Sequence, residues 1–458
     1  MPEEVIHRHV EKSRIKTVAI LLQLFYYVYS RNKLQAKEEN AIMDLDYGMV
    51  KLDNEVRTEA LSFVRKAMSV GESFESEEAA FEFIERLLLD SELTKDLNFR
   101  EKDNLIRQVY FSVRCDVGLL YPFTEDKKVT EIMVNGTENI FVERDGTLIN
   151  TGKSFSNVEE LEEIIRRIAA RVHREINELN PIVDARLLDG SRVNAVYKNV
   201  ALNGPALTIR RFPEKAYDMK DMIGFGSITE EAADFLEKLV RFGSNVFISG
   251  GTGSGKTSML NVLSSYIPKD ERVITIEDAA ELQIIGIENL VRMECKQSNV
   301  QGMGEVDMQQ LIRSSLRMRP NRIIVGEVRG KEVLDMLNAF NTGHDGSLST
   351  GHGNSVKGML KRLETMVMQA ADFPIDAIRG QIVEGIDVMV HLSRMADKSR
   401  KVLEITEILG HDGSDYVLNE IFLYDKEKGL QRTGNKMKNI RKMILRGLKE
   451  EELWAKEN

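Results

Sequence analysis

One stretch constrains the fold of this chain more than any other: "NVFISGGTGSGKTSMLNVLSSYIP", from Asn245 to Pro268. An apolar strand pattern leads into four glycines within six residues, and a helical pattern follows. Glycines let backbone amides turn inward and approach phosphate oxygens without a Cβ in the way. The N-terminus of the following helix adds partial positive charge. The stretch therefore predicts an α/β fold with a phosphate-binding loop between a buried strand and a helix.

This loop matches the G-x-x-x-x-G-K-[ST] pattern of nucleotide-binding proteins. We expect Lys256 to reach the β- and γ-phosphates of ATP and the hydroxyl of Thr257 to bind Mg²⁺. The expected nucleotide-binding residues are Gly250, Gly251, Thr252, Gly253, Ser254, Gly255, Lys256, Thr257 and Ser258. A glycine-rich turn without a ligand is the alternative, and the strand before and the helix after the loop argue against it.

Two acidic residues stand at the ends of predicted buried strands. Glu277 ends "VITIE" and Glu327 follows "RIIVG". Hydrolysis of ATP needs a carboxylate that orients or deprotonates water beside the γ-phosphate and helps to hold Mg²⁺. Either acid alone could be a solvent-exposed strand end. Two acids on strands that would flank the loop strand indicate chemistry instead.

The segment "NTGHDGSLSTGHGNS" contributes His344 and His352, eight residues apart. A metal site is one interpretation, but no third ligand recurs with metal spacing. A neutral histidine that hydrogen-bonds near the γ-phosphate and responds to its loss fits better.

Composition narrows the class of protein. The chain has 458 residues, a net charge of −10 and two cysteines. The acidic balance argues against a surface dedicated to nucleic acid, and two isolated thiols fit a reducing cytoplasm. The longest apolar run, Thr17 to Ser30, is shorter than the roughly 20 residues that span a bilayer. We expect it to be a buried or partner-facing helix, with a membrane-surface helix as the alternative.

Periodicity divides the chain into five parts. The expected parts are a helical region at 1–114, an α+β domain at 115–212, a linker at 213–226, a nucleotide-binding α/β domain at 227–425 and a basic tail at 426–458. Two helices have predicted caps, one at Ser156 with Glu159 and one at Ser227 with Glu230. Strands past residue 400 predict a small trailing β element.

The basic tail allows two interpretations. Met437, Ile440, Ile444 and Leu448 fall on one face of a predicted helix. Such a basic amphipathic helix could touch anionic lipid or a membrane partner. A C-terminal helix that packs by its apolar side is the other interpretation.

Four motifs of this chain resemble, in their order, those of the type II/type IV secretion ATPase superfamily. They are "GGTGSGKTSMLN", "TIEDAAEL", "LIRSSLRMRPNRIIVGEVRG" and "NTGHDGSLSTGHGNS". The resemblance is closest to the CpaF branch, which serves Flp/tight-adherence pilus assembly. The resemblance covers about residues 115 to 425 and not the first 110. It implies a RecA-like P-loop ATPase domain preceded by a PAS-like α+β domain and an N-terminal helical region. It further implies a cytoplasmic homo-hexamer at the inner face of the cell membrane.

The resemblance also assigns roles to individual residues. Glu277 would be the catalytic or Mg²⁺-water carboxylate of an acidic box, and Glu327 would polarise the attacking water. His344 and His352 would form the His box. Arg210 and Arg211 would reach the nucleotide from the N-terminal domain. Arg313, Arg317 and Arg319 are further candidates for a neighbouring subunit's nucleotide or for interface ion pairs.

The resulting hypothesis is an ATP-hydrolysing motor that uses ATP and Mg²⁺ and drives inner-membrane platform proteins of a pilus or secretion machine. Binding of nucleic acid is not expected, and a peripheral contact with the membrane is allowed. The first alternative is a nucleotide-gated scaffold with little turnover. A P-loop phosphotransferase would need an acceptor pocket and lid that the sequence does not reveal. A nucleic-acid translocase is disfavoured by the acidic balance and by the lack of interleaved aromatic and basic residues.

Overall fold

The computed structural model describes residues 54–454 except 69–73, 75, 173, 188, 212–216, 297 and 299–302. It divides the chain into two compact units, one ending at Arg211 and one beginning at Phe212. The apolar run Thr17 to Ser30 lies outside the described residues. No helix among the described residues is long and apolar enough to span a membrane.

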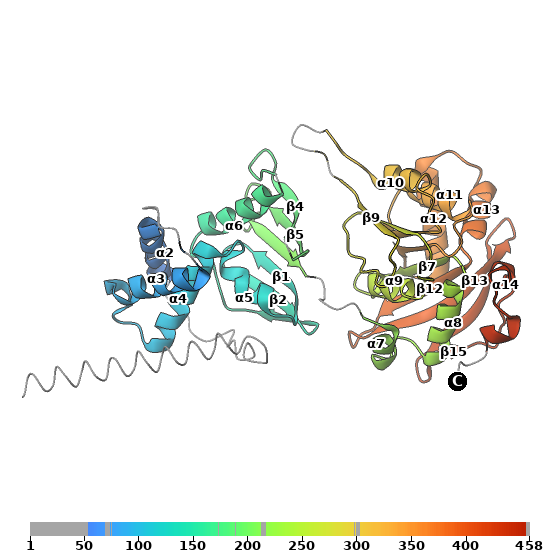
Figure 1. Cartoon of the computed structure of the whole chain (residues 1–458), viewed down its shortest axis with the longest axis horizontal. Coiled ribbons are helices and arrows are strands. Elements are labelled where there is room, and N and C mark those ends of the chain that lie inside the picture. The colour runs from blue at the N-terminus through green and yellow to red at the C-terminus, as the bar shows by residue number, and fades with distance from the viewer. Residues whose placement is uncertain are drawn as a thin grey trace, which may run out of the picture. The chain divides into compact units, whose positions relative to one another are not determined.

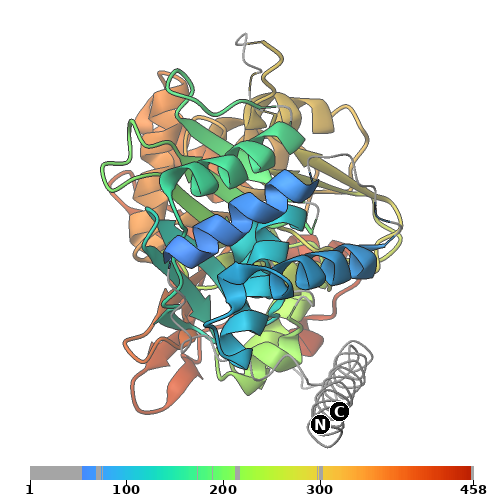
Figure 2. The same ribbon diagram turned by 90° about the vertical axis from the view of Figure 1, so that its left-hand side faces the viewer.

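The first unit combines a helical bundle with an α+β part (Figures 1 and 2). The helices are α2 (Asn54–Met68), α3 (Glu77–Leu89), α4 (Phe99–Arg114), α5 (Tyr121–Glu125) and α6 (Val158–Arg171), with short 3₁₀ turns at Glu92–Thr94 and Gly118–Leu120. The strands are β1 (Val129–Asn135), β2 (Asn139–Arg144), β3 (Thr147–Asn150), β4 (Ile182–Arg186), β5 (Arg192–Val196) and β6 (Ala206–Arg210). They form one antiparallel sheet in the order β3-β2-β1-β6-β5-β4.

Tight turns with left-handed backbone join the antiparallel strands of this sheet. Asp145 and Gly146 have φ of 51° and 74°, and Gly136 and Gly190 have φ of 68° and 88°. Left-handed backbone of this kind is what favours Asn-Gly and Asp-Gly in tight hairpins. The cap of α6 was predicted one residue too early. Asn157 is the N-cap, and the carboxylate of Glu160 accepts from the backbone N–H of Ser156.

A buried ion pair joins the helical bundle to α6. Arg57 on α2 pairs with Glu160 on α6, and their side chains are 4% and 3% exposed. The same carboxylate accepts a hydrogen bond from Ser112 Oγ at 3.0 Å, and Arg57 donates to the carbonyl of Ser154. The bundle and the α+β part are thus tied by charge as well as by packing. Figure 2 shows α2, α3 and α4 in blue on the side of the unit that faces the viewer.

The second unit is a three-layer α/β structure (Figure 1). Its helices are α7 (Met219–Gly224), α8 (Glu230–Arg241), α9 (Lys256–Ser264), α10 (Met308–Ser315), α11 (Val333–Phe340), α12 (Val356–Ala370), α13 (Ile375–Gly385) and α14 (Arg441–Leu445), with a 3₁₀ turn at Glu450–Leu453. Its strands are β7 (Val246–Gly250), β8 (Val273–Glu277), β9 (Leu290–Glu294), β10 (Arg322–Val328), β11 (Leu348–His352), β12 (Val388–Arg394), β13 (Arg400–His411), β14 (Tyr416–Asp425) and β15 (Gly429–Arg432).

Helices cover both faces of the nine-stranded sheet because the central strands are apolar on both sides. Val246 and Ile248 of β7 pack with α8 and α9, whereas Phe247 packs with α11 and α12. The sheet order is β15-β14-β13-β12-β7-β11-β10-β8-β9, and the strands from β12 to β9 run parallel. Strands buried on both faces are typical of parallel α/β sheets. The predicted α/β class, with an α+β part before it, is confirmed.

Two expectations for the second unit are corrected. Thr229, not Ser227, precedes α8, and its side chain makes no capping hydrogen bond. The strands after residue 400 are not a separate trailing element. Strands β13 to β15 add to the antiparallel side of the same sheet, and β13 pairs with β12 along most of its length.

The tail also differs from the amphipathic helix that its pattern predicts. Helix α14 covers only Arg441–Leu445, so Met437 and Leu448 do not share a helix with Ile444. Met437, Met443 and Leu448 are buried in the core beside α8, whereas Ile444 is 46% exposed. The buried carboxylate of Glu407 accepts from the backbone N–H groups of residues 438 and 439. This packing favours the second interpretation of the tail.

The buried side chain of Asn245 ties together the starts of three central strands. Its Oδ1 accepts from the backbone N–H groups of Gly346 and Ser347, and its Nδ2 donates to the carbonyl of Gly385 at 2.9 Å. Its own backbone N–H donates to a carboxylate oxygen of Asp387 at 2.8 Å. These residues stand just before β11 and β12, so one amide fixes both strands against β7.

Removal of the buried cation tests the tie within the first unit. We expect Arg57→Ala to lower the free energy of unfolding by about 3 kcal/mol, because it leaves a buried carboxylate without its partner. Arg65→Ala is the matched control. It breaks the Arg65–Glu163 pair, whose side chains are 40% and 41% exposed, and we expect a loss below about 1 kcal/mol. Urea denaturation of both variants measures the difference, and equal losses would contradict the tie.

Candidate active site

The phosphate loop lies where β7 ends and α9 begins. Gly253 and Gly255 have φ of 69° and 96°, a left-handed backbone that glycine adopts at no steric cost. A Cβ on Gly250 would stand 2.5 Å from the carbonyl oxygen of Leu392 and 2.5 Å from Ser254 Oγ. Three of the predicted glycines are therefore required by the backbone itself.

Parallel pairing brings the predicted histidine to this loop. His352 ends β11 and lies opposite Gly250 in the register of β7 and β11. Its Nδ1 is 3.3 Å from Lys256 Nζ, and its Nε2 is 2.9 Å from Glu327 Oε1. Lys256 Nζ also donates to the carbonyl of Gly251 at 3.1 Å. A lysine, a histidine and a carboxylate from three separate elements thus form one hydrogen-bonded chain.

The proton of His352 has a defined place in this chain. Burial lowers the pKa of the imidazole, with Lys256 and Arg329 acting in the same direction and Glu327 opposing them. The ring is therefore neutral at pH 7 and carries one proton. Since an ammonium group has only donors, Nδ1 must accept from Lys256 and Nε2 must donate to Glu327.

Glu327 is held from its other side by an arginine. Arg329 Nε and Nη2 lie 3.1 and 3.2 Å from the two oxygens of Glu327, and its Nη1 lies 3.6 Å from Asp278. Burial acts to raise the pKa of Glu327, but the hydrogen bonds and charge of Arg329, with His352 and Lys256, leave the pKa below its usual value. Glu327 is therefore an ionised carboxylate. Arg329 was not predicted, although it stands two residues beyond Glu327.

Glu277 occupies a different environment. Its side chain is buried at the end of β8, and its Oε2 accepts from the backbone N–H groups of Glu281 and Leu282 at 2.6 and 2.8 Å. Its Oε1 is buried without a hydrogen-bond partner. Burial raises the pKa of this carboxyl, and the two backbone donors offset part of that rise. An unpartnered carboxylate oxygen of this kind fits a cation or its bound water.

Gly326 leaves the room that Glu277 needs. A Cβ at position 326 would lie 3.0 Å from Glu277 Cγ. The space that a side chain at position 326 would need is thus filled by the side chain of Glu277. The two carboxylates are neighbours at the ends of β8 and β10, which pair in parallel. These strands do not flank the loop strand as predicted, because β11 and β12 are the neighbours of β7.

His344 lies at the amino ends of the parallel strands, opposite to the phosphate loop. It precedes β11, and its Nδ1 is 2.9 Å from the carbonyl oxygen of Ala339. A five-residue strand, roughly 15 Å long, separates it from His352. The structure therefore does not bring His344 to the phosphate loop of the same chain, and the two histidines cannot share a metal ion within one chain. Among the described residues, no group of three His, Cys, Asp or Glu could hold a metal ion.

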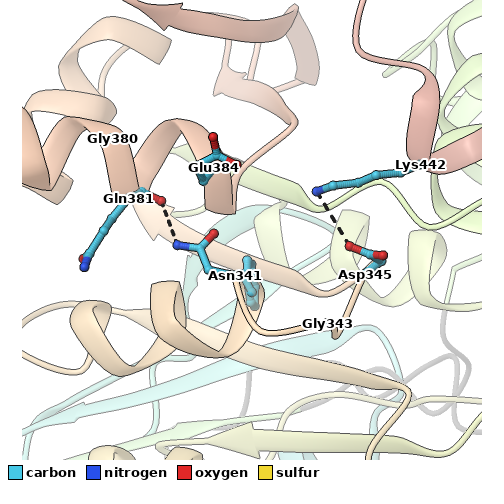
Figure 3. A pocket seen from close by; sticks show the side chains of 8 residues that line it. Asn341, Gly343, Asp345, Gly380, Gln381, Glu384 and Lys442 are labelled. Carbon is cyan, nitrogen blue, oxygen red and sulfur yellow. Dashed lines mark hydrogen bonds and ion pairs between the residues drawn. The ribbon is translucent and has the colours of Figure 1, made fainter.

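A pocket of about 370 Å³ lies at this amino edge and not at the phosphate loop (Figure 3). It is lined by Phe340, Asn341, Gly343, Asp345, Gly380, Gln381, Glu384 and Lys442. Lys442 reaches Asp345 across it at 3.7 Å, and Asn341 donates to the carbonyl of Gln381 at 3.2 Å. None of the residues of the hydrogen-bonded chain lines this pocket.

The candidate arginines fall into separate groups. Arg211 donates to the carbonyls of Asp126 and Val129 within the first unit, and Arg210 is exposed at the end of β6. Arg313 makes a two-bond contact with Asp335 of the same chain. Arg317 and Arg319 are exposed, and Arg319 has φ of 54°. The roles of all five at a nucleotide stay predictions.

The histidine geometry makes a measurable prediction. We expect His352 to keep the proton on Nε2 and to have a pKa below about 6.5, the ordinary value of histidine. Protonation at lower pH would remove the acceptor for Lys256. Imidazole ¹⁵N spectra across pH measure the tautomer and the pKa, with His352→Gln identifying the signal. A titration midpoint of His352 at or above the ordinary value would contradict the hydrogen bonds proposed for His352 with Lys256 and Glu327.

A family model matches most of this chain. The profile of the family described as "Type II/IV secretion system protein" matches residues 115–447. A putative conjugal transfer protein of Mycobacterium tuberculosis is 31% identical over 303 residues, which are 65% of this chain and 85% of that protein. An uncharacterized protein of Methanocaldococcus jannaschii is 43% identical over 253 residues, 53% of this chain but only 35% of that protein.

Solved structures with similarity include a VirB11 ATPase from the Brucella suis type IV secretion system, crystallised with sulphate. It is 28% identical, its TM-score is 0.34, and the match covers 64% of this chain and 94% of that one. The Legionella pneumophila ATPase DotB is 21% identical with a TM-score of 0.46, over 73% of this chain and 85% of that one.

Proposed function

Because the chain belongs to the type II/IV secretion system protein family, we propose that it is an ATPase that powers a pilus-assembly or protein-secretion machine. One observation carries the proposal. The phosphate loop, His352 and Glu327 meet in one hydrogen-bonded chain at the carboxyl edge of a parallel sheet. Ligands of open α/β sheets bind at this edge.

Each residue of the site has a proposed role. Backbone amides of residues 250 to 258 bind the phosphates, and Lys256 leaves His352 to pair with the β- and γ-phosphates. Glu327 is ionised and orients the attacking water. Glu277, with its unpartnered oxygen, and Thr257 would hold Mg²⁺ or its water. The metal ion, when bound, supplies charge neutralisation on the β- and γ-phosphates.

His352 links these events. With Lys256 turned to the phosphates, Nδ1 of His352 loses its donor while Nε2 still holds Glu327. The hydrogen bonds of the imidazole thereby depend on whether a phosphate is bound, and a change in them alters the position of the Glu327 carboxylate. His344 would act on a part of the ring other than the phosphate loop of its own chain.

We further propose that the protein works as a homo-hexamer in the cytoplasm, against inner-membrane platform proteins. Arginines 210 and 211 would contact ATP in the ring and lose the γ-phosphate after hydrolysis. The state that they stabilise would then lose its advantage, and the two units would move. Motif resemblance to the CpaF branch suggests Flp/tight-adherence pili as the machine. A nucleotide-gated scaffold with little turnover is the second candidate, and the raised pKa of Glu277 is compatible with either.

Glu327→Gln separates the two candidates. The amide keeps an acceptor for His352 but cannot take a proton, so we expect ATP turnover to fall about hundredfold or more while ATP binding is retained. Glu384→Gln, an exposed carboxylate at the opposite edge of the sheet, is the matched control and should keep full turnover. Phosphate release and equilibrium binding of ATP are the two measurements. A wild-type chain that binds ATP and releases no phosphate would instead support the scaffold.

Gly326→Ala tests the placement of Glu277. The new Cβ would press on Glu277 Cγ, and two backbone hydrogen bonds prevent that side chain from yielding. We expect turnover to fall at least about tenfold through misplacement of the carboxylate. Gly380→Ala is the control, because a Cβ there meets nothing within 4 Å. Unchanged turnover in Gly326→Ala would argue against a catalytic role of Glu277.

A further inference from the structure

The hairpin between β12 and β13 places two arginines beside the phosphate loop. Arg394 ends β12, Arg400 begins β13, and the two are opposite each other in the antiparallel register. The turn is closed by a hydrogen bond from Met395 N–H to the carbonyl of Ser399 at 2.8 Å. Its acidic residue, Asp397, accepts from the N–H and hydroxyl of Ser399. Neither arginine was singled out by a sequence motif.

The base of this hairpin is fixed against the start of the loop. Leu392 of β12 pairs with Gly250 of β7, and the carbonyl oxygen of Leu392 lies where a Cβ of Gly250 would stand. The arginines are therefore held beside the loop by a strand of the central sheet. Their position does not depend on the other unit.

Arg400 makes a direct contact with the loop. Its Nε donates to the carbonyl of Gly253 at 3.1 Å, and its Cδ lies 3.7 Å from the point where a Cβ of Gly255 would stand. The side chain thus lies along the two glycines with left-handed backbone. A hydrogen bond from a charged donor is stronger than one between neutral groups.

This contact sets the direction of an amide that faces the inside of the loop. In a planar trans peptide, the carbonyl of Gly253 and the N–H of Ser254 point in opposite directions. With the carbonyl held outward by Arg400, the N–H of Ser254 points to the opposite side, where it donates a long hydrogen bond to the carbonyl oxygen of Gly251 at 3.4 Å. A phosphate oxygen would replace this carbonyl as the acceptor. Inward N–H groups are the ones that bind phosphate oxygens.

Arg394 acts without such a contact. Its Nη1 lies 3.8 Å from the point where a Cβ of Gly253 would stand. A second guanidinium thus lies next to the same glycine, on a hairpin whose one carboxylate is used within the turn. It adds positive potential for a polyphosphate through space.

We propose that Arg400 is a positioning residue that pre-organises the phosphate loop for the triphosphate of ATP, and that Arg394 adds a screened attraction. The inference rests on the proposed function, since it concerns the affinity of the same site. It assigns to the subunit's own hairpin a contribution that the arginines of the first unit cannot supply.

Equilibrium binding of mant-ATP and steady-state turnover, on the full chain, test the proposal. We expect Arg400→Ala to raise the Kd for mant-ATP and the KM for ATP about five- to tenfold. We expect kcat to change by less than about twofold, because the oriented amide binds the ground state and the transition state alike. Arg400→Lys retains the charge and one donor and should recover about half of the loss on a logarithmic scale.

Lys398→Gln is the matched control. Lys398 stands at the exposed tip of the same hairpin, so its change removes one positive charge without touching Gly253. Equal effects of Lys398→Gln and Arg400→Ala would overturn the positioning role. An unchanged Kd in Arg400→Ala would overturn it as well, and so would a loss of kcat with constant KM. Thermal unfolding without nucleotide should be the same in all variants.

The salt dependence of nucleotide binding distinguishes the role of Arg394 from that of Arg400. We expect Arg394→Ala to weaken binding about twofold at roughly 0.05 M salt and not at roughly 0.5 M, where charges are screened within a few Å. The loss in Arg400→Ala should persist at both concentrations, and a salt-independent loss in Arg394→Ala would overturn the attraction. Binding is measured without hydrolysis. A wild-type chain that binds mant-ATP and does not hydrolyse ATP would refute the proposed ATPase and leave this test intact.

Discussion

The buried amide of Asn245 sets the register on which the site depends. It joins the residue before β7 to the residues before β11 and β12, with hydrogen bonds to both. Residues 246–250, 348–352 and 388–392 then run side by side over five paired positions. Because the starts are level, the ends are level too. Gly250, His352 and Leu392 therefore meet at the carboxyl edge, where the phosphate loop begins.

Glu327 and Glu277, at the carboxyl ends of the parallel strands, have different electrostatic environments. Glu327 accepts from an arginine and a histidine and stays ionised, whereas Glu277 is buried with backbone donors on one oxygen and none on the other. Neighbouring carboxylates whose environments move their pKa values in opposite directions are a common way to divide roles in hydrolysis. Gly326 makes the arrangement sterically possible, because any side chain there would push Glu277 away.

The phosphate loop is supported from both sides within its own unit. The His352–Glu327 chain reaches Lys256 from β11 and β10, and the β12–β13 hairpin reaches Gly253 from the opposite neighbour strand. A loop with four glycines has little conformational preference of its own. External hydrogen bonds of this kind supply the order that the glycines lack, and they couple the loop to the strands that would respond to a bound phosphate.

Much of this unit was predictable from local sequence. The glycine spacing, the lysine and the apolar runs before Glu277 and Glu327 predicted the loop, the parallel sheet and the strand-end positions of both candidate acids, since each depends only on neighbours along the chain. The caps at Ser156 and Ser227 were predicted wrongly because several polar residues compete within two positions at a helix start. The tail was predicted as one amphipathic helix, but packing against α8 and the carboxylate of Glu407 shortened it to five residues.

Tertiary structure alone decided which distant residues meet. No spacing relates His352 to Lys256, Arg57 to Glu160 or Arg400 to Gly253, because these pairs are separated by 96, 103 and 147 residues. The same reason separates His344 from His352, although they are close in sequence: a strand carries them to opposite edges of the sheet. The sequence by itself determined the chemistry that each segment can offer, and the register of the sheet decided which of those groups act together.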